Sequence, residues 1–101
     1  MGFKRDNILT VCEKPVGTSV VFLATIPAGV CEGQMTFYNR GTTAIVVSVK
    51  SKIPTLVNYY IYLAAGAQYT EEGIIPGDVS ALGAAAGGVL SMNCSFSVRS
   101  I

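Results

Sequence analysis

The 101-residue sequence contains no histidine and no tryptophan, and only 13% of its residues are charged. Ordinary soluble domains carry about 25% charged residues. Without an imidazole, a serine or cysteine nucleophile lacks its usual general base. Zinc-site spacing is also absent, because the cysteines include no CxxC pair. These absences argue against an enzyme and lead us to expect no catalytic residue, no metal and no cofactor.

Charge of either sign is scarce along most of the chain. Seven Lys and Arg balance six Asp and Glu to a net charge of +1. The chain therefore lacks the excess of positive charge that is typical of proteins that bind nucleic acid. Residues 53–70 and 79–98 hold no charged side chain, and about 20 apolar residues suffice to cross a bilayer. Both stretches are interrupted by glycine and asparagine. We therefore expect no nucleic-acid partner and no membrane span.

The cysteines are few and odd in number: Cys12, Cys31 and Cys94. Free cysteine is a small hydrophobe that is mostly buried, and disulfides are rare in a reducing cytosol. We expect three reduced, buried side chains. A disulfide with one spare thiol is the alternative, and Cys12 with Cys94 is the pairing that it suggests.

What the sequence does contain is alternation with a period of two residues. In the last segment, Leu90, Met92, Cys94, Phe96 and Val98 alternate with serine and asparagine. Alternate residues of a strand point to opposite faces of a sheet. The segment therefore predicts a strand with one face on a core and one small polar face.

Similar short runs recur about every ten residues, separated by turn residues such as "NRG" (39–41) and "PGD" (76–78). The runs around 30–41 and 43–54 suggest a hairpin, and the "GAAAGG" link (83–88) a hairpin connection rather than a phosphate cradle. Seven to eight antiparallel strands predict an all-β, single-domain β-sandwich or jelly roll, with a barrel as runner-up.

The domain boundary is predicted from charge. Five of the thirteen charged residues fall in the first fourteen positions, so residues 1–14 are interpreted as an N-terminal arm and 15–101 as the sandwich domain. One short strand, from Ile8 to Cys12, is expected within the arm.

Tyrosines gather in one uncharged segment, and Tyr60 and Tyr62 lie on the same face of a predicted strand. A large ring with a polar tip is favoured at protein interfaces. We predict a partner interface there, with a sugar-stacking platform as the alternative.

The segments "TIPAG", "YNRGTTAIVVSV", "IYLAAGAQY" and "GIIPGDVSALGA", followed by the alternating final strand, span roughly residues 17–101. Their rhythm of turns and strands resembles small virion proteins of tailed bacteriophages, of the jelly-roll or β-sandwich type that serves as capsid decoration (cement) proteins. The resemblance implies a homotrimer made in the host cytoplasm that sits on the capsid surface and bridges subunits of the major capsid protein. A tail, neck or fibre-attachment component is the alternative, and a carbohydrate-binding module is a second one.

In such a virion protein, the arm would reach a neighbouring subunit. Lys4 and Arg5 would meet acidic partners, and Phe3, Ile8 and Leu9 would provide apolar anchors.

Overall fold

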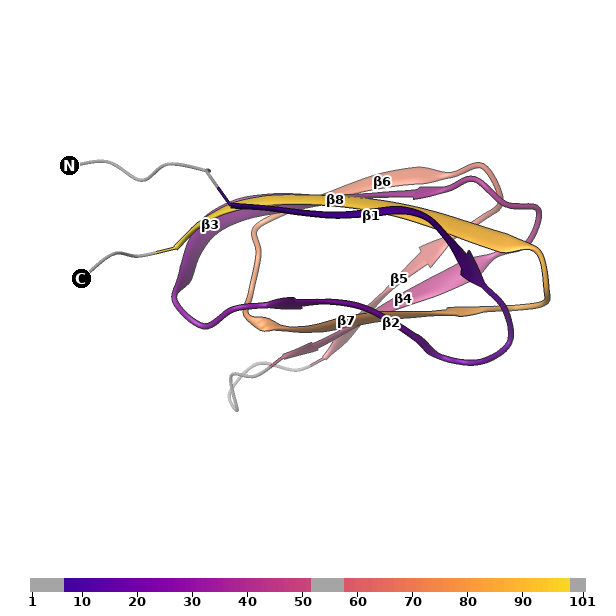
Figure 1. Cartoon of the computed structure of the whole chain (residues 1–101), viewed down its shortest axis with the longest axis horizontal. Coiled ribbons are helices and arrows are strands. Elements are labelled where there is room, and N and C mark those ends of the chain that lie inside the picture. Colours follow the sequence, from indigo (N-terminus) through magenta and orange to yellow (C-terminus); the bar gives the residue numbers. More distant parts are fainter. Residues whose placement is uncertain (1–6, 52–57, 99–101) are drawn as a thin grey trace.

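The computed structural model describes residues 7–51 and 58–98, which form two facing layers of strands (Figure 1). The eight strands are β1 (Asn7–Val16), β2 (Val21–Ile26), β3 (Val30–Asn39), β4 (Ile45–Ser51), β5 (Tyr59–Leu63), β6 (Gln68–Glu72), β7 (Gly77–Gly83) and β8 (Gly88–Val98). All strand pairs are antiparallel. The predicted all-β sandwich of seven to eight strands is confirmed.

The first sheet has the strand order β1-β8-β3-β6 and the second has the order β2-β7-β4-β5. Among consecutive strands only β4 and β5 pair with each other, so every other connection crosses between the sheets. Eight strands in two such interleaved sheets make a jelly roll. The predicted hairpin of 30–41 with 43–54 is wrong, because β3 and β4 lie in different sheets.

The corner between β3 and β4 is held by a buried amide. Asn39 is fully buried, and its Nδ2 donates to the carbonyl of Thr43 at 2.8 Å and to that of Leu63 at 3.1 Å. Its Oδ1 accepts from the Gly41 N–H at 3.1 Å. Leaving any one of these buried groups unpaired costs about 1–3 kcal/mol. Asn39 therefore ties the end of the first sheet to the edge of the second, which a solvent-exposed hairpin turn does not need.

The glycine-rich link between β7 and β8 is also a crossing and not the predicted hairpin connection. A Cβ on Gly83 would lie 2.9 Å from the carbonyl oxygen of Val16, and one on Gly88 would lie 2.6 Å from it. The Gly83 N–H donates to the carbonyl of Gly17 at 2.8 Å. These glycines allow the link to pack closely against the connection from β1 to β2.

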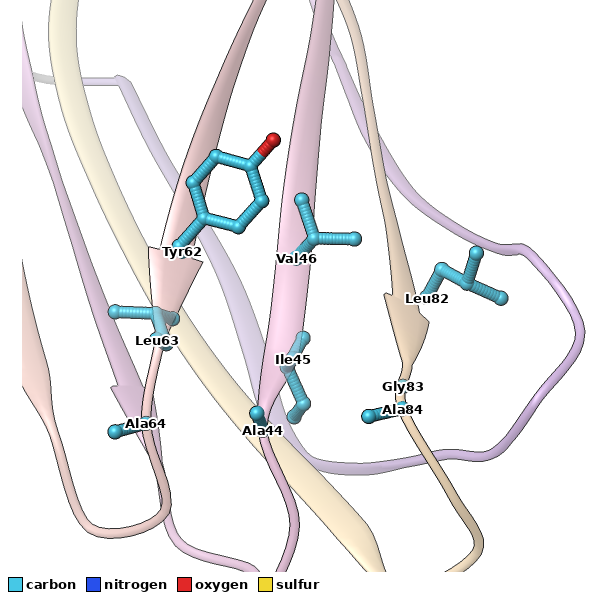
Figure 2. Close-up of a pocket in the computed structure, with 9 residues that line it drawn as sticks. All are labelled: Ala44, Ile45, Val46, Tyr62, Leu63, Ala64, Leu82, Gly83 and Ala84. Atoms are coloured by element: carbon cyan, nitrogen blue, oxygen red, sulfur yellow. The ribbon is translucent and has the colours of Figure 1, made fainter.

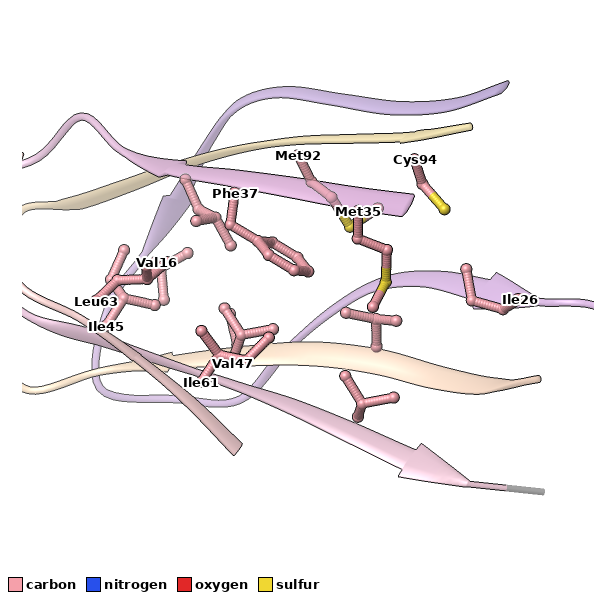
Figure 3. Packing of buried hydrophobic residues seen from close by; sticks show 14 of the residues in the cluster. Val16, Ile26, Met35, Phe37, Ile45, Val47, Ile61, Leu63, Met92 and Cys94 are labelled. Atoms are coloured by element: carbon pink, nitrogen blue, oxygen red, sulfur yellow. The ribbon is translucent and has the colours of Figure 1, made fainter. Parts of the chain in front are cut away.

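The core fills the space between the two layers (Figure 3). Alternation places Leu90, Met92, Cys94 and Phe96 of β8 in it, as predicted. Val98 does not follow, since it is 38% exposed at the strand end, beyond a register shift between β3 and β8. The other buried apolar residues are Val16, Ile26, Met35, Phe37, Ile45, Val47, Val49, Ile61, Leu63, Val79 and Ala81.

Strand β1 differs from the predicted arm. Residues 7–14 run along β8 in Figure 1 and pair with it, so the sheet begins well before residue 15. Leu9 and Val11 pack against the core. The strand expected from Ile8 to Cys12 is therefore present, and it continues to Val16 past a bulge between Val11 and Lys14, where Glu13 has a φ of 48° and the alternation is interrupted. The predicted anchors Phe3, Lys4 and Arg5 lie outside the described residues.

Candidate protein interface

The outer face of the first sheet, here called the polar face, consists mostly of polar side chains. They are Thr10, Gln34, Thr36, Thr70, Glu72, Ser91, Asn93 and Ser95, and the exposed Ile8 and Tyr38 lie beside Ser95 and Ser91 on the same face. The hydroxyls of Thr36 and Thr70 lie 3.2 Å apart across β3 and β6. Such side chains bond readily to each other and to water, so this face suits solvent.

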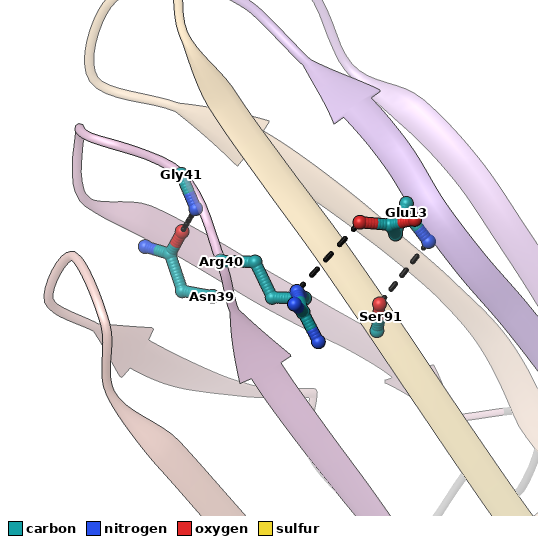
Figure 4. A network of polar contacts seen from close by, with 5 residues as sticks. All are labelled: Glu13, Asn39, Arg40, Gly41 and Ser91. Atoms are coloured by element: carbon teal, nitrogen blue, oxygen red, sulfur yellow. Dashed lines mark hydrogen bonds and ion pairs between the residues drawn. The ribbon is translucent and has the colours of Figure 1, made fainter.

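A polar cluster closes one end of this face (Figure 4). The Glu13 N–H donates to Ser91 Oγ at 3.1 Å, and the Glu13 carboxylate lies 3.7 Å from Arg40 Nε. The Arg40 guanidinium also lies over the Tyr38 ring, 5.4 Å from its centre. Both ends of the ion pair are more than half exposed, so the pair contributes at most about 1 kcal/mol. It fixes the β1 bulge more than it stabilises the fold.

The outer face of the second sheet, here called the apolar face, carries Phe22, Val46, Tyr60, Tyr62 and Leu82, and Ser80 and Ser48 lie side by side between Phe22 and Tyr60. Val46 is the cross-strand partner of both Tyr62 and Leu82. Tyr62 is 80% exposed, Phe22 59% and Tyr60 57%. Neighbouring apolar side chains such as those of Tyr62, Val46 and Leu82 typically mark an interaction site.

A hollow of about 580 Å³ opens at one end of the apolar face. In Figure 2, Tyr62 and Leu82 stand on either side of Val46, and Ala44 and Ala84 lie at the lower end. The full lining is Ala44, Ile45, Val46, Tyr62, Leu63, Ala64, Leu82, Gly83 and Ala84. Short alanines between larger side chains create the space. The hollow is almost wholly apolar and suits an aliphatic side chain.

The other end of the same face is charged. Lys50 of β4 is the cross-strand partner of Asp78 of β7. Asp78 Oδ1 accepts a hydrogen bond from Thr25 Oγ1 of β2 at 2.8 Å. The face therefore grades from an apolar hollow at one end to a pair of opposite charges at the other.

The predicted interface residues fall in different places. Tyr60 and Tyr62 share the apolar face, as their alternation predicts. Ile8 is 63% exposed on β1, whereas Leu9 is half-buried against the core, so the two predicted anchors point in opposite directions. Leu82 and Phe22 were not predicted. They could be found only by knowing which strands neighbour β4 and β5.

Ionisable groups gather at the seam where the edge strands β5 and β6 of the two sheets meet. The Tyr69 hydroxyl donates to Glu71 Oε1 at 2.9 Å, which raises the Tyr69 pKa. Burial, with a smaller contribution from the Glu71 charge, raises the pKa of Tyr59 to about 12. Both phenols therefore stay neutral at physiological pH and act as hydrogen-bonding and packing groups.

The cysteines depart in part from the prediction. Cys94 is buried, and burial raises its thiol pKa to about 11, so the thiol is protonated and inert at neutral pH. Cys12 is exposed on β1, so the expectation that it is buried is wrong. Both thiols are free, and the Cys12–Cys94 bridge considered above is not formed. The side chain of Cys31 lies outside the described part of the structure.

Residues 7–51 and 58–98 contain no cluster of three or more histidine, cysteine, aspartate or glutamate side chains that could hold a metal ion. No helix long and apolar enough to cross a membrane occurs in this part of the chain.

Comparison with known proteins gives one informative result. No protein-family model matches the chain, and no curated protein matches it. A similar solved structure is described as "Bacillus endospore appendages form a novel family of disulfide-linked pili". It superposes with a TM-score of 0.62 at 17% sequence identity, over 92% of this chain and 88% of that one. At this identity the likeness shows a shared fold.

Proposed function

We propose that the chain is a non-enzymatic structural subunit that assembles with further copies of itself. The observation that carries this proposal is the apolar face, where Phe22, Tyr60 and Tyr62 are all more than half exposed. Exposed apolar side chains that gather on one face of a protein typically mark an interaction site. A chain with 13% charged residues has little other means of keeping such a face soluble.

A filament on a cell or spore surface is one setting for this subunit. The similar solved structure belongs to pili that are described as disulfide-linked. An exposed Cys12 on β1 gives this chain a thiol within reach of another molecule. In this setting, copies of the chain are the only partner needed.

A virion is the second setting. It is supported by the resemblance to phage decoration proteins and by the scarcity of charge, since a chain covered by a shell needs few charged residues. The chain would then form a trimer on the capsid surface and bridge subunits of the major capsid protein, or form part of a tail or neck. Ile8 would be an exposed anchor for the shell.

Carbohydrate binding is the alternative from another class. Tyr60 and Tyr62 are two exposed rings on one face of β5, and stacked sugars use such rings. The Val46 and Leu82 side chains beside Tyr62 add apolar surface, and Ser48 beside Tyr60 adds a hydroxyl that a sugar could bind.

Native mass spectrometry and negative-stain electron microscopy of the purified chain, with and without a reducing agent, test the proposal. Oligomers or ordered assemblies of the chain alone are the expected result. Filaments would favour the pilus setting, and binding of oligomers to undecorated phage shells the virion setting. A chain that stays monomeric at every concentration and binds glycans on an array, with binding lost in Tyr60→Ala, would contradict it.

A further inference from the structure

We infer that the apolar face binds the same face of a second copy around a two-fold axis that runs along the strands, between β4 and β7. This inference rests on the proposed self-assembly and specifies its contact. When one surface of a protein binds the same surface of a copy, a two-fold axis relates the two. For two sheets packed face to face, that axis lies in the plane between them.

The apolar face has its hollow at one end and its charged residues at the other, and this difference determines the direction of the axis. An axis across the strands would lay the hollow of one copy, lined by Val46 and Leu82, on the charged end of the other. An axis along the strands lays the two hollows together and the two charged ends together.

The charges of Lys50 and Asp78 determine between which two strands the axis lies. In the order β2-β7-β4-β5, the middle of the sheet lies between β7 and β4. An axis there places Lys50 over the partner's Asp78, and Asp78 over the partner's Lys50. Because Lys50 and Asp78 are also cross-strand neighbours within one chain, four charges of alternating sign meet. Any shift of the axis by one strand would lose this match.

The hollow is consistent with the same axis. In that arrangement the partner's Leu82 lies over Val46, between Tyr62 and Leu82 of the first copy, which is where the hollow opens (Figure 2). The same contact repeats on the other side of the axis. The hollow and the residue that fills it therefore belong to the same face, as a two-fold contact requires.

The size of the face sets the strength of the dimer. Four strands spaced about 4.8 Å apart and six residues long at about 3.3 Å each cover roughly 19 by 20 Å. Each copy would then bury on the order of 400 Å², which is below the roughly 800 Å² per partner of a standard stable interface. The contact is thus small and weak, and a larger assembly needs a second contact.

Sedimentation velocity of charge-reversed variants tests the inference. Lys50→Glu alone places two pairs of negative charges across the axis, and Asp78→Lys alone places two pairs of positive charges. We expect each variant to raise the dimer Kd by about tenfold or more. An equimolar mixture of the two should dimerise again, because each mixed dimer contains one Glu–Lys pair and one Asp–Lys pair. A mixture that dimerises no better than the single variants would overturn the inference.

Leu82→Arg tests the hollow, and Thr36→Arg on the polar face is the matched control. The first should abolish dimers at concentrations where the unaltered chain dimerises, and the control should leave them in place. Circular dichroism melts establish that every variant is folded. If the chain assembles and Leu82→Arg assembles equally well, this contact is wrong and the proposed function stands. If the unaltered chain never assembles, the proposed function falls with it.

Discussion

The two outer faces of the sandwich are built by the same rule and serve different neighbours. On both sheets, strand alternation sends one set of side chains into the shared core and the other set outward. On β3 and β6 the outward set includes Thr36 and Thr70, whose hydroxyls meet. On β4 and β5 it includes Val46 and Tyr62, which expose apolar surface. Alternation therefore determines what lies inside, and the chemistry of the outward positions determines whether water or protein covers the outside.

The largest expected effect tests the assignment of inside and outside on β8. Phe96 is 3% exposed in the core, so Phe96→Ala should cost about 3–5 kcal/mol in the free energy of unfolding, measured by urea titration. Ser95→Ala, the neighbouring outward position, should change it by less than about 0.5 kcal/mol. Similar effects at the two positions would remove the distinction between the core and the polar face.

A smaller effect is expected at the seam between the sheets. An ordinary tyrosine loses its proton near pH 10, but the pKa of Tyr59 in the folded chain is about 12. The folded state therefore keeps a proton that the unfolded state has lost, so stability is present below pH 10 and falls as the pH rises towards 12. The Tyr59→Phe variant should lose up to about 2 kcal/mol less than the unaltered chain over this range.

Urea titrations between pH 9 and pH 12 measure this difference. Tyr62→Phe is the control, because it removes the same hydroxyl group from a ring that is 80% exposed on the apolar face. Burial also raises the pKa of Cys94 to about 11, and this thiol is present in all three proteins. Superimposable profiles for the unaltered chain and Tyr59→Phe would show that the seam is open to solvent.

The smallest effects compare the two faces directly in the monomer. A double-mutant cycle with Thr36→Val and Thr70→Val should give a coupling of about 0.2–1 kcal/mol, because the hydroxyls meet across the strands. Tyr62→Ser should change monomer stability by less than about 0.5 kcal/mol, since the ring is mostly exposed. A large loss on Tyr62→Ser would mean that the apolar face stabilises the monomer itself rather than an assembly.

The sequence predicted single strands well and their pairing poorly. The alternation of Leu90, Met92, Cys94 and Phe96 was enough to place β8 and its core face, because side-chain direction is a local property of a strand. The sequence predicts the turn at 39–41 and a hairpin around it, but in the structure this turn joins strands of different sheets. The local sequence does not distinguish a hairpin turn from a connection between two sheets. Here the difference depends on Asn39, whose side chain is buried and bonds to the carbonyl of Leu63, more than twenty residues away.

The candidate interface shows the same limit. Tyr60 and Tyr62 could be predicted, since large exposed rings in alternation are visible in the sequence. Phe22 and Leu82 could not, because β2, β7, β4 and β5 become neighbours only in the folded sheet. The strand expected from Ile8 to Cys12 is present in β1, but its continuation to Val16 was not predicted, because the bulge at Glu13 breaks the two-residue period.

By itself, the sequence determined that the chain is an all-β sandwich with little charge, because composition and a two-residue period are properties of the chain alone. Only the tertiary structure decided which outward residues share a face, because antiparallel pairing joins strands that are far apart in sequence. The hollow beside Tyr62 and the opposite charges of Lys50 and Asp78 are consequences of that pairing. Together they form one surface that is complementary to the same surface of a second copy.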